Sequence, residues 1–360
     1  MRSLRKNNYM NKKIIILVVA VIIIVVVGIV WWQSKSIPKY TGPIEKITVG
    51  VEKSLLPSLV WVAENKGYFQ ENGTEVTIKE FDSGRAAFTS MLDKGGLDMV
   101  TVAQTPIMFN SFTRSDFAIT AGMVSSYNDV FVLARTDRGI TKPGDLRGKK
   151  IGVTKGSTGH YFLGLFGVTK GSTGHYFLGL FLDTNNIQFS DVEIVDLPTG
   201  QLTQNIAAGA VDAISTWQPN IYNAQKSLGA KSITFPNNKI FREDFYFVTN
   251  QQFLQNHPEA IIRFLEAIKQ AEDFIQNNRD QAVAIVSQRL GIDKNFVSSV
   301  WNDFQLRLFM DQTIIQVIED EARWAIQNKL TNKTEVPNYL DYIYLDALQK
   351  VKPEAVTIIK

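Results

Sequence analysis

Small polar residues beside glycines are the side chains whose types and spacing best suit contact with a ligand. Gly152–Phe166 has the sequence GVTKGSTGHYFLGLF, and Gly167–Phe181 repeats it without a change. Each copy combines a short β-prone piece, a Gly-Ser-Thr-Gly turn and an apolar helical run. A strand, a small-residue loop and a helix start present backbone N–H groups and hydroxyls, which suits an anionic group. The sequence therefore predicts an anion-binding loop.

Two copies of this loop cannot both occupy one site. Either the first copy keeps strand and loop and the second rejoins inside the helix, or the second forms strand, loop and helix, with Phe166 replacing Ile151. Interrupting a helix loses hydrogen bonds, whereas lengthening a connection costs only slowly growing entropy. We therefore favour the second copy. Its candidate residues are Ser172, Thr173, Gly174 and His175, and the alternatives in the first copy are Ser157, Thr158, Gly159 and His160.

Four further candidates follow predicted strands. Ser54 comes after the first strand, and Gln104 and Thr105 come after a continuous apolar strand and before Pro106. Each could bond a ligand oxygen or only cap a helix. Trp217 could form a wall of the cleft or a half-buried part of the core.

Charged residues near these loops have simpler explanations. Arg85 could pair with a carboxylate or sulfonate, although a surface arginine is the ordinary role, and Asp82 flanks the same loop. Asp212 is expected to order a turn.

Several classes of function are disfavoured. The chain has no cysteine and three histidines, two of them copies, so thiol catalysis, thiolate metal sites and a His-rich metal centre are not expected. Glycines in 156–164 lack the Lys-Ser/Thr pair of a phosphate-binding loop. We expect no enzyme activity, cofactor or metal.

The N-terminus predicts a membrane segment. Residues 14–32 are uncharged, mostly Ile and Val, and end in Trp31-Trp32, which is just long enough to span a bilayer. Arg2, Arg5, Lys6, Lys12 and Lys13 precede it, which places the body outside the cytoplasmic membrane. We expect an uncleaved anchor; a cleaved secretory signal, with a secreted body, is the alternative. The rest of the chain carries 33 of the 38 basic side chains against 35 acidic ones, which gives no reason to expect nucleic-acid binding.

The body alternates predicted strands and helices, which is typical of parallel sheets flanked by helices. Strands are expected at 46–51, 74–81, 97–103, 192–197, 213–216 and 231–235, and helices at 57–66, 85–93, 142–147, 201–208 and 220–228. Five further helices are expected at 260–277, 281–290, 296–309, 314–329 and 339–350. Asp129–Arg135 and Asp244–Asn250 are both apolar strands led by an Asp, and we expect them to be paired hinge strands between two lobes.

Five segments resemble the substrate-binding proteins of ABC importers for nitrate, sulfonate, taurine and thiamine-precursor-type ligands. They are LVWVAENKGYF (Leu59–Phe69), Gly96–Val102 with Gln104-Thr105, DLRGKKIG (Asp145–Gly152), the GSTGHYFLGLFL string, and GAVDAISTWQP (Gly209–Pro219). They cover roughly residues 46–250. Gln218 stands where many members of that family have Glu, which favours an anionic over a cationic ligand.

The resemblance implies an α/β, two-lobed type II periplasmic-binding-protein fold with a ligand in the cleft. It implies capture of a small molecule and delivery to a permease and its ATPase, without covalent chemistry. The alternatives are a membrane-anchored sensor or scaffold, or a binder of a thiamine pyrimidine precursor. The expected organisation is a basic N-terminus (1–13), an anchor (14–32), a tether (33–45), lobe one (46–134), lobe two (135–244, with the duplication 152–166/167–181), and a return to lobe one with C-terminal helices (245–360).

Overall fold

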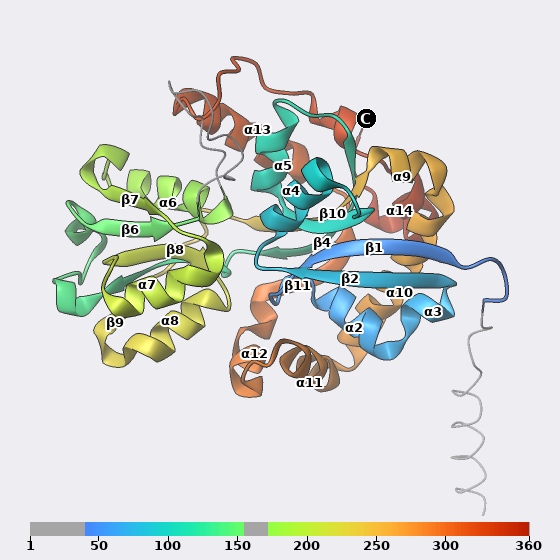
Figure 1. Cartoon of the computed structure of the whole chain (residues 1–360), viewed down its shortest axis with the longest axis horizontal. Coiled ribbons are helices and arrows are strands. Elements are labelled where there is room, and N and C mark those ends of the chain that lie inside the picture. Colours follow the sequence, from blue (N-terminus) through green and yellow to red (C-terminus); the bar gives the residue numbers. More distant parts are fainter. Residues whose placement is uncertain (1–39, 155–171, 360) are drawn as a thin grey trace, which may run out of the picture. The chain divides into compact units, whose positions relative to one another are not determined.

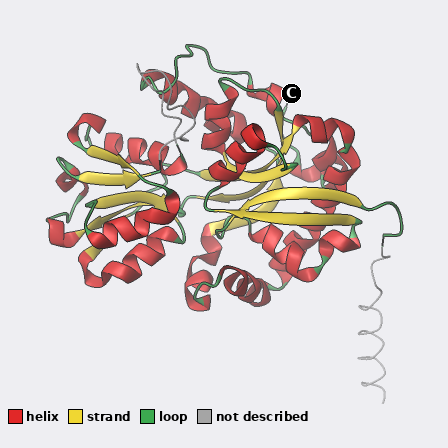
Figure 2. Cartoon of the chain, in the orientation of Figure 1, coloured by secondary structure: helices red, strands yellow, loops and turns green. Residues whose placement is uncertain are grey.

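The strands of the protein form two separate sheets, with helices packed on their faces (Figures 1 and 2). The structure is a computed structural model and describes residues 40–154 and 172–359. One hydrophobic core surrounds the first sheet, and two smaller ones lie on the second. Each sheet with its helices is a lobe, so the α/β two-lobed prediction is confirmed.

The first sheet has six strands in the order β11-β4-β10-β3-β1-β2. Strands β1, β2 and β3 are parallel, while β10 runs antiparallel to both β3 and β4. The carboxyl ends of β1 to β4 and the amino end of β10 therefore lie at one edge. The bounds are β1 (Glu45–Glu52), β2 (Thr74–Phe81), β3 (Met99–Ala103), β4 (Phe117–Ser126), β10 (Glu243–Asn250) and β11 (Phe304–Phe309).

Helices of the first lobe begin and end at recognisable signals. Helix α2 follows Pro57 and stops at Gly67, whose φ of 75° is in the left-handed region that favours glycine. The helices are α2 (Ser58–Lys66), α3 (Tyr68–Glu71), α4 (Gly84–Lys94), α5 (Gln104–Ser111), α9 (Gln251–Asn256), α10 (Pro258–Asn277), α11 (Arg279–Leu290), α12 (Lys294–Val300), α13 (Thr313–Gln327) and α14 (Asp346–Val351).

The second sheet has five strands in the order β7-β6-β8-β5-β9. Strands β6, β7 and β8 are parallel, and β5 runs antiparallel between β8 and β9. The carboxyl ends of β6 to β8 again share one edge. The elements are β5 (Val130–Arg135), β6 (Lys150–Val153), β7 (Glu193–Asp196), β8 (Ala213–Trp217) and β9 (Ser232–Phe235), with α6 (Thr173–Thr184), α7 (Leu202–Ala208) and α8 (Asn220–Leu228).

The two expected hinge strands do not pair with each other. Strand β5 belongs to the second sheet and β10 to the first, and each is bonded on both sides within its own sheet. The chain therefore passes between sheets at 127–129 and again at 236–242, instead of leaving lobe one near Arg135. The apolar Asp-led pattern reflects burial within each sheet.

The helix expected at 296–309 is wrong in its second half. Helix α12 ends at Val300, and Phe304–Phe309 forms β11. Its first residues alternate between buried and exposed, which is the period of a strand with one buried face. Residues 339–350 are also not one helix: a 3-10 turn (Tyr339–Tyr342) precedes α14.

The duplicated stretch contributes one strand and one helix to the described structure. Strand β6 combines Lys150 and Ile151 with the first two residues of the first copy, and α6 begins in the second copy. The Ser172 hydroxyl donates a hydrogen bond to the Thr154 carbonyl. The expected replacement of Ile151 by Phe166 is wrong, because Ile151 itself pairs with Ile194 and Ala213. The run Lys149-Lys150-Ile151 leads directly into the first copy, so the strand needs no substitute.

No helix within residues 40–154 and 172–359 is long and apolar enough to cross a membrane. The span expected at 14–32 lies outside the described residues.

Candidate functional site

A small cavity is lined by residues that follow the strand ends of both sheets. About 10 Å³ of it is open to a molecule the size of water, which is space for about one. The lining residues are Glu52, Ser83, Gly84, Arg85, Ala103, Pro106, Ser172, Thr173, Trp217, Glu243 and Phe245. The position agrees with the rule that ligands of open α/β sheets bind beyond the carboxyl ends of the strands.

Each lobe presents a serine-capped helix start to this cavity. The Ser83 hydroxyl accepts a hydrogen bond from the Ala86 N–H (3.1 Å), and the Ser172 hydroxyl accepts one from the His175 N–H (3.3 Å). Both caps stabilise a helix by satisfying an N–H that would otherwise lack a partner. The starts of α4 and α6, one in each lobe, are therefore capped in the same way.

Glycines let both helices pack directly against a strand. A Cβ on Gly84 would lie 2.7 Å from the Thr101 carbonyl oxygen, and a Cβ on Gly174 would lie 2.7 Å from the Ser215 carbonyl oxygen. The Ser215 hydroxyl also donates to the Gly174 carbonyl (2.7 Å). Gly174 thus serves close packing of helix on strand, whereas we expected it to let a ligand approach.

Arg85 brings positive charge into the cavity. Its Nε is buried and has no hydrogen-bond partner among the described residues. Burial lowers the pKa of the Arg85 guanidinium, and the charge of Asp196 opposes that fall. A buried guanidinium with a free donor beside the α6 N-terminus can bind a sulfonate or carboxylate.

Glu52, at the end of β1, occupies the N-terminus of α4. Its Oε2 accepts from the Gly84 N–H (2.6 Å) and its Oε1 accepts from the Trp217 indole N–H (2.8 Å). Burial raises the pKa of Glu52 to about 7, although those two donors and Ser54 oppose the rise. Glu52 thereby joins the two lobes and leaves the α6 N-terminus as the open anion-binding end.

Asp129 and Glu243 place two more carboxyl groups beside Glu52. Both oxygens of Asp129 and the Oε2 of Glu243 form no hydrogen bond of normal geometry with the described residues, although the two carboxyl groups are neighbours, with the Gln218 N–H near Asp129 and the Thr173 hydroxyl near Glu243. Burial raises the pKa of Asp129 to about 7, and burial together with the charge of Asp129 raises that of Glu243 well above its usual range. No set of three His, Asp or Glu side chains in the described part of the chain is arranged to hold a metal ion.

Three of the predicted site residues line the cavity: Ser172, Thr173 and Trp217. Arg85, a weaker candidate in the sequence, lines it too. The copy-one alternatives Ser157, Thr158, Gly159 and His160 lie outside the described residues.

The other predicted site residues lie outside the lining. Ser54 accepts from the Leu56 N–H (3.3 Å), and Gln104 bonds the Arg242 carbonyl and the Asp244 N–H (both 2.9 Å). Thr105 is buried beside Glu321. His175 packs against Phe189 and Trp324 at ring distances of 5.7 and 6.3 Å, which is the packing role that sequence reasoning left open.

The remaining polar candidates have local roles. The Asp212 carboxylate accepts from the Lys150 N–H (2.9 Å), as expected of a residue that orders a turn. Gln218 accepts from the Tyr222 N–H (3.1 Å) and so supports the start of α8. Asp82 does not line the cavity.

Sequence reasoning missed the three buried acids. Glu52 ends the first strand, two residues before Ser54, and Asp129 was noted only as the leader of an apolar strand. Glu243 directly precedes Asp244, which was noted for the same reason. The sequence signal that could have identified them is a carboxylate at one end of a buried strand. Only the fold shows that these three strand ends lie together at the cavity.

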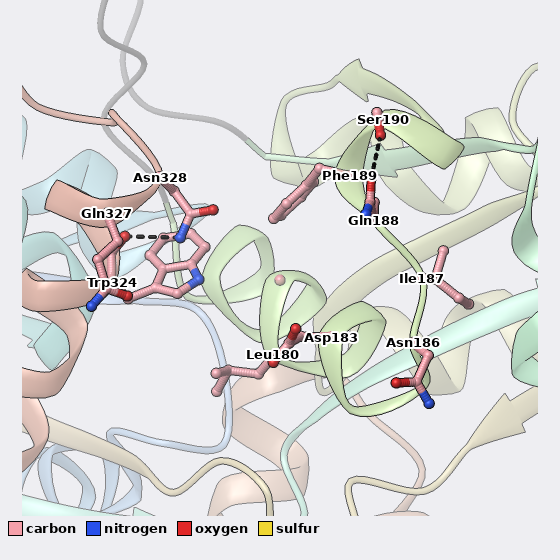
Figure 3. Close-up of a pocket in the computed structure, with 11 residues that line it drawn as sticks. Leu180, Asp183, Asn186, Ile187, Gln188, Phe189, Ser190, Trp324, Gln327 and Asn328 are labelled. Atoms are coloured by element: carbon pink, nitrogen blue, oxygen red, sulfur yellow. Dashed lines mark hydrogen bonds between the residues drawn. The ribbon is translucent and has the colours of Figure 1, made fainter.

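A larger pocket, of about 650 Å³, lies between α6 and α13. Trp324, Gln327 and Asn328 line one side, and the segment from Gly179 to Ser190 lines the other (Figure 3). Asp183 is the one charged side chain in its lining. This pocket lacks the helix starts and the buried charges of the smaller cavity, so it is the weaker candidate site.

Comparisons with known proteins agree with this geometry. Residues 58–282 match the family model described as "NMT1/THI5 like". An aliphatic sulfonates-binding protein of Bacillus subtilis (strain 168) is 26% identical over 309 residues, 84% of this chain and 87% of that protein. The taurine-binding periplasmic protein of Escherichia coli (strain K12) is 25% identical over 247 residues, 64% of this chain and 67% of that protein.

Solved structures show the same fold. The alkanesulfonate-binding protein SsuA from Xanthomonas axonopodis pv. citri, bound to MOPS, has a TM-score of 0.67 at 17% identity and covers 85% of this chain and 100% of its own. The desulfurization enzyme DSZB has a TM-score of 0.62 at 15% identity, and the match covers 86% of this chain and 99% of that protein. The family match spans more than half of the chain, and the cavity lies where the fold places a ligand. The chain therefore belongs to the NMT1/THI5-like family of periplasmic-type binding proteins.

Proposed function

We propose that this protein is an extracytoplasmic solute-binding protein of an ABC importer. It captures a small organic ligand bearing an anion, of sulfonate, taurine or nitrate type, between its lobes and delivers it to the permease, whose ATPase drives transport. Residues 14–32 anchor it in the cell membrane. The protein itself performs no covalent chemistry.

One observation carries this proposal: two helix starts, from different lobes, flank one cavity that also contains Arg85. The α6 N-terminus and the Thr173 hydroxyl provide donors, and the guanidinium provides positive charge. Together they suit a tetrahedral or planar oxyanion. Relatives named for sulfonate and taurine binding support the same ligand class.

A binding role is favoured over catalysis. The fold also occurs in a desulfurization enzyme, so the fold alone does not decide. The chain has no cysteine, and the described cavity lining contains no histidine, so neither thiolate nor imidazole is available there as a nucleophile or base.

The proposal is tested by thermal shift and calorimetry with taurine, ethanesulfonate, nitrate, short carboxylates and pyrimidines. We expect at least one sulfonate to stabilise the protein and Arg85→Gln to weaken its binding at least about tenfold, since a charged hydrogen bond is lost. Arg323→Gln, on the exposed face of α13, is the matched control. Stabilisation by pyrimidines or by simple cations alone would refute the proposal.

A further inference from the structure

The cavity has more acidic than basic side chains. Of the described residues that line it or contact its acids, Glu52, Asp129 and Glu243 are acidic, and Arg85 is the only basic one in the lining. Glu52 accepts hydrogen bonds from two donors, whereas both oxygens of Asp129 and the Oε2 of Glu243 form none of normal geometry with the described residues. A simple anion would gain nothing from these acids, because burial disfavours their ionised form and any acid that did ionise would repel the anion.

Glu243 identifies where a positive group would bind. It is 2% exposed, its Oε2 forms no hydrogen bond of normal geometry with the described residues, and it lines the cavity together with its neighbour Thr173. Asp129 is 1% exposed and lies against it. An ammonium group is about the size of the one water for which there is space, and its three N–H donors would satisfy these oxygens.

We propose that Asp129 and Glu243, supported by Glu52, form a subsite for the ammonium group of a zwitterionic ligand. The anionic end of that ligand lies at Arg85 and the α6 N-terminus, so the ligand class is an aminoalkanesulfonate or a similar amino acid analogue. This inference rests on the proposed function and specifies the ligand of the same cavity. The expectation from Gln218, an anionic rather than a cationic ligand, applies to the end of the ligand at Arg85.

The topology explains why these acids meet. Glu243 pairs with Ser126 at the cavity edge of the first sheet, while Val130, next to Asp129, pairs with Trp217 in the second. The Trp217 indole then bonds Glu52. Both crossings of the chain thus place a carboxylate at the junction of the lobes, where a bound cation would contact both lobes at once.

The test compares taurine with ethanesulfonate, which has the same anionic end but no amine, by calorimetry on the full chain. We expect taurine to bind at least about tenfold more tightly. Glu243→Gln and Asp129→Asn should each remove most of this preference, measured as the ratio of the two affinities. Glu321→Gln is the matched control, because Glu321 is fully buried and does not line the cavity.

The number of protons released when a ligand binds to the wild-type protein gives a second measurement that needs no variant. The ionisable groups around the subsite are Glu52, Asp129, Glu243, Asp303 and Arg85. A bound ammonium favours ionised carboxylates, so taurine should release protons near pH 7, whereas ethanesulfonate should not. Titrations in two buffers of different ionisation enthalpy measure this.

The outcomes separate the two proposals. Equal affinity for both sulfonates, or a preference that survives in both carboxamide variants, would overturn the ammonium subsite and leave the proposed function standing. If neither sulfonate binds, the proposed function fails and the subsite assignment fails with it.

Discussion

Glu52, Asp129 and Glu243 are carboxyl groups that the fold buries at the junction of two lobes, and they should make stability depend on pH. Their ordinary pKa values are 4.5 or 3.8, and burial raises those of Glu52 and Asp129 to about 7. Between these values the folded protein binds more protons than the unfolded chain, so the free energy of unfolding falls as pH rises. Asp244 and Glu321, whose pKa values burial also raises, act in the same direction.

We therefore predict that the ligand-free protein melts several °C lower at pH 8 than at pH 5. The rise in the pKa of Glu52 alone corresponds to on the order of 3 kcal/mol. Glu243→Gln should flatten the profile, because it removes one of the charges that must otherwise be buried. Calorimetric melts between pH 5 and pH 8 check both expectations. Glu193→Gln, which changes an exposed acid, is the control. A melting temperature that rises between pH 5 and pH 8 would contradict the account.

The two identical serines give a second prediction at the residue scale. Ser172 caps α6 and lines the cavity, so Ser172→Ala should cost about 1 kcal/mol of stability and weaken ligand binding several-fold. Ser157→Ala is the matched control in the other copy and should change neither. Thermal melts and ligand titrations of both variants decide the assignment. A binding defect in the Ser157 variant instead would move the site to the first copy.

Among the elements, β6 and α6 show how a fold accommodates a duplication. The strand ends in the first copy and the helix begins in the second, and Thr154 and Ser172 lie in hydrogen-bond contact. Joining Thr154 directly to Lys170 would restore one uninterrupted copy. The fifteen surplus residues, 155–169, are therefore not needed to build either element.

We predict that deletion of residues 155–169 leaves a folded protein with unchanged ligand affinity. Its melting temperature should stay equal or rise, since a shorter connection loses less entropy on folding. Circular dichroism melts and calorimetry check this prediction. Loss of folding or binding would show that the surplus residues contribute to the site. Deletion of 173–184, which removes α6 itself, is the contrasting control.

Local pattern predicted most of the first lobe but missed β4 and β11. Strands β1 and β2 and helix α4 carry clear periodicity bounded by turns. Strand β4 is buried at every residue, so it has no alternation by which to identify it. Strand β11 follows α12 closely, and its apolar residues also fit a helical period.

The candidate site was predicted only where a local motif carries it. Ser172 and Thr173 belong to a loop whose composition predicts the start of a helix. Glu243 and Asp129 become neighbours through two chain crossings that are far apart in the sequence, and no local pattern contains that information. Ser54 and Gln104 looked equivalent to Ser172, but their hydrogen bonds are used within the first lobe.

At the scale of the whole binding unit, the contacts between the lobes in the described ranges 42–154 and 172–359 include three that use aromatic side chains. The Glu52–Trp217 hydrogen bond lies at the cavity, Tyr222 of α8 stacks on Phe296 of α12 at 3.9 Å, and Trp324 of α13 packs on Tyr176 of α6 at 4.8 Å. The cavity has space for about one water molecule. A ligand could therefore enter the cavity only after these contacts between the lobes open. The lobes would then close around the ligand by a hinge motion.

We predict that Tyr222→Ala weakens ligand binding about two- to tenfold without changing the taurine preference. The stacked pair lies outside the cavity and stabilises only the closed arrangement, by roughly 0.5–1.5 kcal/mol. Calorimetry with taurine and ethanesulfonate measures both quantities. Phe253→Ala, which removes a ring contact within the first lobe, is the control. A changed ratio of the two affinities would show that Tyr222 contacts the ligand.

The most direct test of the central claim is a crystal structure of the protein with taurine bound. The account predicts sulfonate oxygens at Arg85 and the Thr173 end of α6, and the ammonium group at Glu243 and Asp129. Taurine bound in the pocket between α6 and α13, or bound in the cavity with its ammonium group away from both carboxylates, would contradict it.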